Sequence, residues 1–341
     1  MEKFRLFASC LPVKGFRRSV ICDIQRSKIK FIPNIIFDLL IKNDGYSKDQ
    51  ILALNDVDNH QEIEEWLNYL VENEYAYWCT NPELFPKLNL DWESPELINN
   101  SIIDADGSSN HNYEDIFKQL DTLGCKHLQL RFFYSINYQD LIDKLRFLDN
   151  SRINTIEIII KYSDNFSIDY LENIARSITR INNIIVHSSP KFERITEFSG
   201  NNSCSIKFIT DLIDSHIHCG NISKEYFVLD QNLFLESQNF NSCLNKKISI
   251  DVNGDIKNCP SMISVYGNVK STRLYDSIMT PGFQQIWKIN KDQITICKDC
   301  EFRYICTDCR AFLSSDNSLD KPKKCSYNPY LAIWEDGIQS L

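Results

Sequence analysis

Apolar positions in the middle of the chain follow two spacings, which predicts an α/β region. Five apolar runs have the length and composition of strands, and three of the four segments between them have apolar residues three or four positions apart. The strand-like runs are residues 97–105, 126–133, 153–162, 181–189 and 205–213, and the helix-like segments are 112–124, 138–150 and 167–179. Because parallel strands need crossover connections, this alternation predicts βα units and a parallel sheet over about 95–225, as an open sheet or a partial barrel.

The first 90 residues predict a smaller unit with another order of elements. Two β-rich runs at 20–24 and 28–32 flank a polar turn, and helical segments follow, one of them with Ser47 as a candidate N-cap, before a last strand at 75–79. This order suits a winged-helix-like module at 1–90. Its helices are acidic or neutral, which favours a peptide or protein partner that a sheet edge would accept as an added strand.

Net charge and the lengths of the apolar runs exclude several partners. The chain has 341 residues and a formal net charge of -9, which argues against a general nucleic-acid surface. The first residues lack the apolar core of a signal peptide, and no run approaches the roughly 18–20 apolar residues that span a bilayer. We therefore expect a cytoplasmic protein with no nucleic-acid partner and no membrane partner.

Cysteine is concentrated near the end of the chain, where its spacing indicates metal or cluster binding. The segment CKDCEFRYICTDC at 297–309 has C-x2-C-x5-C-x2-C spacing, and such pairs of thiolates turn toward one centre. Upstream, Cys243 and Cys259 flank an alternating segment around Asn253-Gly254, a dipeptide that predicts a hairpin with a type I′ turn. Such a hairpin would bring both cysteines together at its open end. The spacing alone does not choose between zinc and iron–sulfur.

The order of seven cysteines resembles the SPASM domain, the auxiliary-cluster extension of radical S-adenosylmethionine peptide-modifying enzymes. The shared pattern is C-x10-G-x4-C, then the quartet, then a final cysteine, although this chain has x2 where the family commonly has x3 before the fourth cysteine of the quartet. The resemblance implies an iron–sulfur domain at 226–341 with up to two [4Fe–4S] clusters. The implied ligands are Cys243, Cys259 and Cys309 for the first cluster and Cys297, Cys300, Cys306 and Cys325 for the second.

A fourth protein ligand for the first cluster is missing from that pattern. Cys219, with His216 and His218 beside it, is a candidate for this place. The alternative for this segment is a strand-to-loop connection with solvated histidines.

A longer resemblance covers most of the chain. Residues 4–25, 247–269 and 297–312 look like the SPASM peptide maturases of grasp-with-spasm systems. The resemblance implies maturation of a ribosomally synthesised, post-translationally modified peptide, with a precursor peptide and an ATP-grasp ligase as partners. It also implies that the first module binds a leader peptide and that 95–225 is a degenerate radical S-adenosylmethionine partial barrel.

The chain lacks the C-x3-C-x2-C motif that such enzymes use to hold their cofactor, so S-adenosylmethionine is not supported. The loop after the first strand of this region contains Asp104, Asp106 and His111 instead, and its ordinary interpretation is a polar loop that caps the next helix. The protein is then either an enzyme or a scaffold that presents the precursor. An alternative from another class is a non-catalytic interaction scaffold with a structural zinc-binding C-terminal domain.

Overall fold

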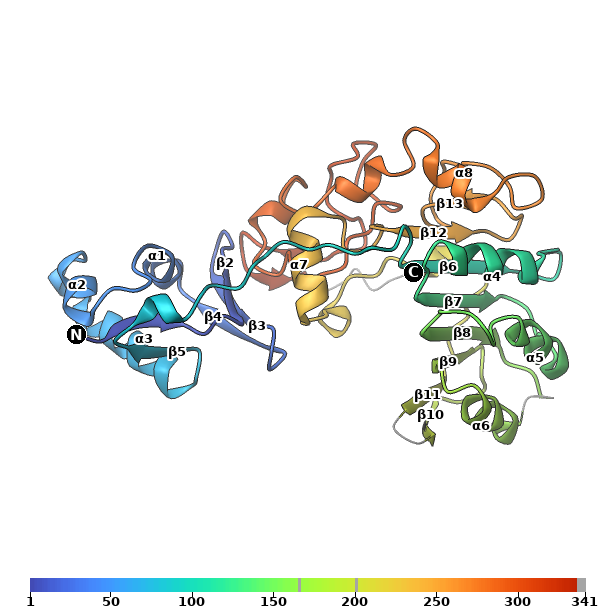
Figure 1. Ribbon diagram of the computed structural model, residues 1–341, viewed down its shortest axis with the longest axis horizontal. Helices are drawn as coiled ribbons and strands as arrows, with labels where there is room; N and C mark the ends of the chain where they lie inside the picture. The colour runs from blue at the N-terminus through green and yellow to red at the C-terminus, as the bar shows by residue number, and fades with distance from the viewer. Residues whose placement is uncertain (165–166, 200–201, 336–341) are drawn as a thin grey trace.

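The computed structural model describes residues 1–164, 167–199 and 202–335, which form an elongated molecule (Figure 1). The first module lies at one end and a large sheet at the other, with the cysteine-rich residues between them. None of the helices within these ranges is both long and apolar enough to cross a membrane.

The large sheet has eight strands in the order β10-β11-β9-β8-β7-β6-β12-β13 and does not close. Five of its strands follow the predicted apolar runs and are parallel. They are β6 (Asn100–Ala105), β7 (His127–Phe132), β8 (Thr155–Lys161), β9 (Ile181–His187) and β11 (Asn202–Phe208). The mixed α/β class and the mainly parallel sheet are therefore confirmed.

Three predicted helices cover one face of this sheet (Figure 1). They are α4 (Tyr113–Thr122), α5 (Tyr138–Arg146) and α6 (Ile168–Ser177). Strand residues alternate between the two faces, so Leu128, Leu130 and Phe132 of β7 join the apolar core under the helices. Arg131 of the same strand consequently points to the opposite face, which carries the polar residues discussed below.

Two parts of the sheet differ from the predicted alternation. Between β9 and β11 the chain forms β10 (Glu193–Ser199), antiparallel to β11, in place of a helix. At the other edge, β12 (Lys247–Ile250) pairs in parallel with β6, and β13 (Ile256–Lys257) pairs with β12. The hairpin predicted around Asn253-Gly254 thus extends the sheet beyond residue 225.

The hairpin is confirmed, but its predicted type I′ turn is wrong. That turn needs two central residues with positive φ, and here only Gly254 has one, at 87°. The Gly254 amide donates to the carbonyl of Asp251, and the Asp251 carboxylate accepts from the amide of Asn253. This side-chain hydrogen bond holds Asn253 in ordinary backbone geometry and leaves glycine alone to reverse the chain.

The first module has the predicted hairpin, helices and last strand in the predicted order, preceded by two strands, β1 (Lys3–Leu6) and β2 (Cys10–Val13), that were not predicted. The other elements are β3 (Ser19–Asp23), β4 (Lys28–Ile32), α1 (Asn34–Lys42), α2 (Lys48–Ala53), α3 (His60–Glu72) and β5 (Ala76–Cys79). Ser47 caps α2 as predicted, in a reciprocal pair with Gln50. The strands β2, β3 and β4 form one antiparallel sheet and β1 pairs with β5. Whether this unit is a winged helix stays a prediction.

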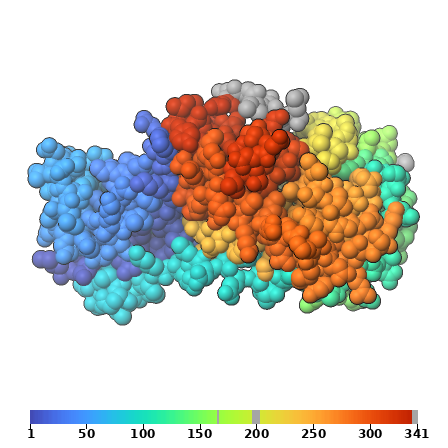
Figure 2. Space-filling model, turned by 90° about the horizontal axis from the view of Figure 1, so that it is seen from above, coloured from blue at the N-terminus to red at the C-terminus, as the bar shows by residue number. Residues whose placement is uncertain are grey.

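The β2–β4 sheet packs against the cysteine-rich region, and the two segments are adjacent on the molecular surface (Figure 2). Val13, Val20 and Cys22 share a core with Phe302 and Ile305. Beside this core, Arg18 donates to the fully buried Glu301 at 2.8 Å, and the hydroxyl of Tyr327 donates to the same carboxylate oxygen at 2.5 Å. The first module is therefore fixed on the segment between Cys300 and Cys306.

The rest of the C-terminal region has little regular structure. Its elements are α7 (Gln231–Asn239), α8 (Leu274–Met279), β14 (Tyr327–Asn328) and β15 (Ile333–Trp334). Short 3-10 helices occur in this region at Gln285–Lys288 and Cys297–Asp299. Elsewhere in the chain they occur at Val57–Asn59, Pro82–Leu84, His216–His218 and Lys224–Tyr226.

Candidate metal centre

The β12–β13 hairpin brings the first two predicted ligands together. Cys243 precedes β12 and Cys259 follows β13, at the open end of the hairpin. Burial, together with the neighbouring Cys243, raises the pKa of the Cys259 thiol to about 12. The ammonium of Lys247 donates to Cys243 Sγ at 3.4 Å.

Two more thiols lie with this pair. Burial raises the pKa of Cys309, and Cys243 and Cys219 contribute to the same shift. The backbone of Gly220 is so close that a Cβ atom added there would lie 2.8 Å from Cys309 Sγ. We call Cys219, Cys243, Cys259 and Cys309 the first thiol group. Cys219, the candidate fourth ligand, therefore interacts with Cys259 and Cys309, two of the three predicted ligands.

The histidines beside Cys219 have separate surroundings. His218 pairs with Asp214 at 3.0 Å near the surface. His216 is half-buried and its pKa is lowered by burial, while Asp104 opposes that shift. Within residues 215–219, Cys219 is thus the side chain that interacts with the other cysteines.

The four other predicted ligands form a second thiol group, Cys297, Cys300, Cys306 and Cys325. Burial, with smaller contributions from Cys325 and Cys297, raises the pKa of Cys306 to about 12. Cys300 likewise has a raised pKa, caused first by burial and then in part by Cys306 and Cys297. The final ligand enters from a separate segment, where Cys325 forms a parallel bridge with Ile222.

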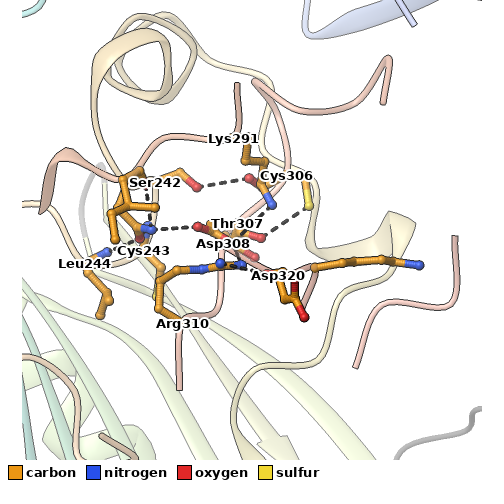
Figure 3. A network of polar contacts seen from close by, with 12 residues as sticks. Ser242, Cys243, Leu244, Lys291, Cys306, Thr307, Asp308, Arg310 and Asp320 are labelled. Carbon is orange, nitrogen blue, oxygen red and sulfur yellow. Dashed lines mark hydrogen bonds and ion pairs between the residues drawn. The ribbon is translucent and has the colours of Figure 1, made fainter. Parts of the chain in front are cut away.

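The last C-x2-C pair is divided between the two groups, since Cys306 belongs to the second and Cys309 to the first. Asp308, 1% exposed, lies between them in the chain and accepts hydrogen bonds from Arg310 at 2.7 Å and from Asn241 at 2.6 Å (Figure 3). The side-chain oxygen of Asn241 in turn accepts from the amide of Cys243 at 3.0 Å. A buried polar bridge therefore links the backbone at the two thiol groups.

Each thiol group has one lysine ammonium beside it, from the half-buried Lys247 in the first group and the buried Lys291 in the second. Lys247 interacts with Cys243, Cys259 and Cys219, while Lys291 interacts with Cys306, Cys297 and Cys325 and lies 3.5 Å from Asp308. Burial alone would lower the pKa of either lysine, but these neighbours reverse the shift, so both pKa values lie above the ordinary value.

Within 1–164, 167–199 and 202–335, no three His, Cys, Asp or Glu side chains are arranged to hold a single metal ion.

The loop after β6 has the ordinary role expected of a polar loop. Asp106 accepts from the backbone and hydroxyl of Ser108, His111 Nε2 bonds the carbonyl of Asp104 at 2.8 Å, and Asn112 caps α4. Asp104 itself belongs to β6, where its carboxylate accepts two hydrogen bonds from Arg131, at 2.6 and 2.7 Å. This pair faces away from the helices, and Arg131 also interacts with Cys219 and Cys259.

Arg131, Lys247 and Lys291 are the polar residues of the site that the sequence analysis missed. A signal exists for Arg131, because an arginine inside the apolar run 126–133 must find a buried counter-charge. For the two lysines the signal is weaker, since lysine is usually exposed and neither spacing nor composition marks them.

Gly220 provides a test of the first thiol group. Alanine at this position should lower the iron content of the protein, because its Cβ would lie 2.8 Å from Cys309 Sγ and 3.0 Å from Phe312. Its φ of +84° adds backbone strain of about 1–2 kcal/mol. Gly45→Ala is the matched control, since Gly45 has a φ of +83° but nothing within 4 Å of the added Cβ. Equal iron content in both variants would contradict the placement of Cys309.

No family model matches the chain, and no curated protein matches it. Among solved structures, seven chains match. Three of these are crystal structures of SuiB from Streptococcus suis: one bound to S-adenosylmethionine, one described as SuiB, and one bound to precursor peptide SuiA. Each is 10% identical to this chain, with 94–95% of this chain and 99% of SuiB covered and TM-scores of 0.36–0.39. A likeness this distant places no functional residue and assigns no activity.

Proposed function

We propose that this protein binds two [4Fe–4S] clusters and takes part, in the cytoplasm, in the maturation of a ribosomally synthesised peptide, together with an ATP-grasp ligase. The observation that carries the proposal is the division of eight thiols into two groups of four. Four thiolates are the usual protein ligand set of one such cluster. The first group reaches this number through Cys219, which supplies the ligand that the seven-cysteine pattern lacks.

The residues around the thiols also favour a negative charge on the sulfur atoms. Buried thiols with raised pKa values stay protonated until a metal displaces the proton. An ammonium partly removed from water is costly without a negative neighbour, and the half-buried Lys247 hydrogen-bonds to a cysteine sulfur. Thiolates that ligate a cluster would supply that negative charge. Cys219, Cys243, Cys259 and Cys309 would then hold the first cluster, and Cys297, Cys300, Cys306 and Cys325 the second.

Bound clusters of this type supply one-electron transfer. The chain's own residues hold and shield them: Asp308 and Asn241 fix the backbone between the sites, and Arg18 with Glu301 anchors the first module on the second site. We favour a scaffold that presents the precursor over a catalyst of radical chemistry, because the sequence has no C-x3-C-x2-C motif. The precursor and ligase partners rest on the resemblance to grasp-with-spasm maturases, and the acidic or neutral helices of 1–90 are in agreement with a peptide partner.

The experiment that tests this function is the measurement of iron, labile sulfide and zinc per chain in protein purified without oxygen. We expect about eight irons with matching sulfide, and saturable binding of a labelled precursor peptide to the same preparation. About two zincs without sulfide would overturn the cluster assignment in favour of a structural zinc domain. Full iron content without peptide binding would keep the clusters and reject the peptide partner.

A further inference from the structure

Lys247 has an unusual set of neighbours for a lysine. Its ammonium donates to Cys243 Sγ at 3.4 Å and interacts with Cys259 and Cys219. Among the residues that the structure describes, it forms no ion pair with a carboxylate within 4.0 Å. Glu236 acts on it from a greater distance, but that carboxyl accepts from Asn245 at 2.7 Å, and burial raises its pKa to about 7. The partners of Lys247 are therefore mainly sulfur atoms, which become negative when they ligate a metal.

The corresponding lysine of the second group is arranged differently. Lys291 lies 3.5 Å from the Asp308 carboxylate, which also accepts from Arg310 and Asn241. Its charge is thus shared between the second thiol group and a carboxylate. Within the part of the chain that the structure describes, only the first group has an ammonium that hydrogen-bonds directly to one of its sulfurs.

We propose that Lys247 is a positioning residue whose positive charge stabilises a cluster in the first thiol group and raises its reduction potential, an inference that rests on the proposed function. Reduction adds one electron to the cluster and makes it one unit more negative, while Lys247 keeps its proton and no bond is broken. A fixed cation in a medium of low dielectric constant favours the more negative state. Hydrogen bonds to the sulfurs of a cluster act in the same direction.

The test is a titration of the anaerobic protein with dithionite, followed by electron paramagnetic resonance at measured potentials. In Lys247→Met, we expect full iron and sulfide content but a fall of about tenfold in the ratio of reduced to oxidised cluster at a given potential, for one of the two cluster signals. For a one-electron couple this corresponds to about 59 mV. Lys247→Arg keeps the charge and should restore a ratio close to that of the unchanged protein.

Lys246→Met is the matched control, because it removes the adjacent lysine. The Lys246 ammonium donates to the carbonyls of Ser94 and Glu96, both at 2.6 Å, rather than to a thiol. Both cluster signals should therefore keep their potentials in this variant.

Two results would overturn the proposal without overturning the proposed function. One is a Lys247→Met protein with full iron content and unchanged potentials, and the other is loss of the first cluster in both Lys247→Met and Lys247→Arg, which would indicate a requirement for lysine shape. Loss in Lys247→Met with retention in Lys247→Arg would support the role of the charge. Protein without iron and sulfide would reject the proposed function before any variant is compared, and this inference with it.

Discussion

Replacing Arg131 with methionine is expected to lower the free energy of unfolding by about 3–5 kcal/mol, the range for removing one partner of a buried ion pair. Arg131 and Asp104 are 5% and 1% exposed, and two hydrogen bonds join them. Burial raises the pKa of Asp104 and Arg131 opposes that rise, so methionine would leave a carboxyl group that ionises only at a large cost. Chemical denaturation followed by circular dichroism measures the difference.

The loss of stability in Arg131→Met should depend on pH in a defined direction. Without Arg131 the folded-state pKa of Asp104 rises further above its unfolded value, so the folded protein binds more protons than the unfolded one in that range. The stability of the variant should therefore fall as pH rises through the window above the ordinary aspartate pKa. Below that window the deficit should shrink, because Asp104 is then protonated in both states.

Two controls make this prediction specific. The double variant Arg131→Met, Asp104→Leu should recover most of the stability, since replacement of a buried pair by apolar residues is often neutral. Arg146→Met removes an exposed partner of Asp143, with side chains 65% and 51% exposed, and should change stability little. A single variant as stable as the unchanged protein at neutral pH would show that Asp104 is not held in a dry interior.

Replacing Cys309 with alanine should remove about four of about eight irons and the matching sulfide, and leave the second cluster in place. Cys309 interacts with Cys243 and Cys219 of the first thiol group, whereas its neighbour Cys306 interacts with Cys325 and Cys297. Metal and sulfide analysis together with absorption near 400 nm would measure the loss. Cys300→Ala should remove the other half.

Cys79→Ala is the control for this pair of variants, because Cys79 lies in β5 of the first module, outside both groups. Its iron content should equal that of the unchanged protein. If Cys309→Ala kept all its iron, or lost all of it while still folded, the division of the last C-x2-C pair between two sites would be wrong.

Much of the fold follows from local pattern, because strand and helix spacing are properties of neighbouring residues. The runs that became β6, β7, β8 and β9 are apolar and bounded by caps such as Asn112, so their type and order are evident. The parallel pairing of β12 with β6 is different, since it joins residues almost 150 positions apart. No local pattern contains such a contact.

The candidate site likewise has one part that follows from local sequence pattern and another that depends on contacts between distant residues. Seven cysteines stand in a spacing that can be read along the chain, but the grouping of Cys219 with them depends on how residues 217–222 lie beside Cys325 and Cys309. The error at Asn253-Gly254 is also instructive, because the side chain of Asp251 holds the turn in a form that the dipeptide alone does not favour. Charged partners such as Lys247 become visible only when the thiols are placed in space.

The separation of ligands along the chain has a consequence for biogenesis. The second thiol group closes within 29 residues, from Cys297 to Cys325, whereas the first spans 91 residues, from Cys219 to Cys309. Loop-closure entropy grows with the logarithm of length, so gathering the first group from an unfolded chain costs about 1 kcal/mol more. The second site should accordingly assemble earlier. Since its last proposed ligand is Cys325, cluster delivery to this site has to wait until residue 325 has left the ribosome.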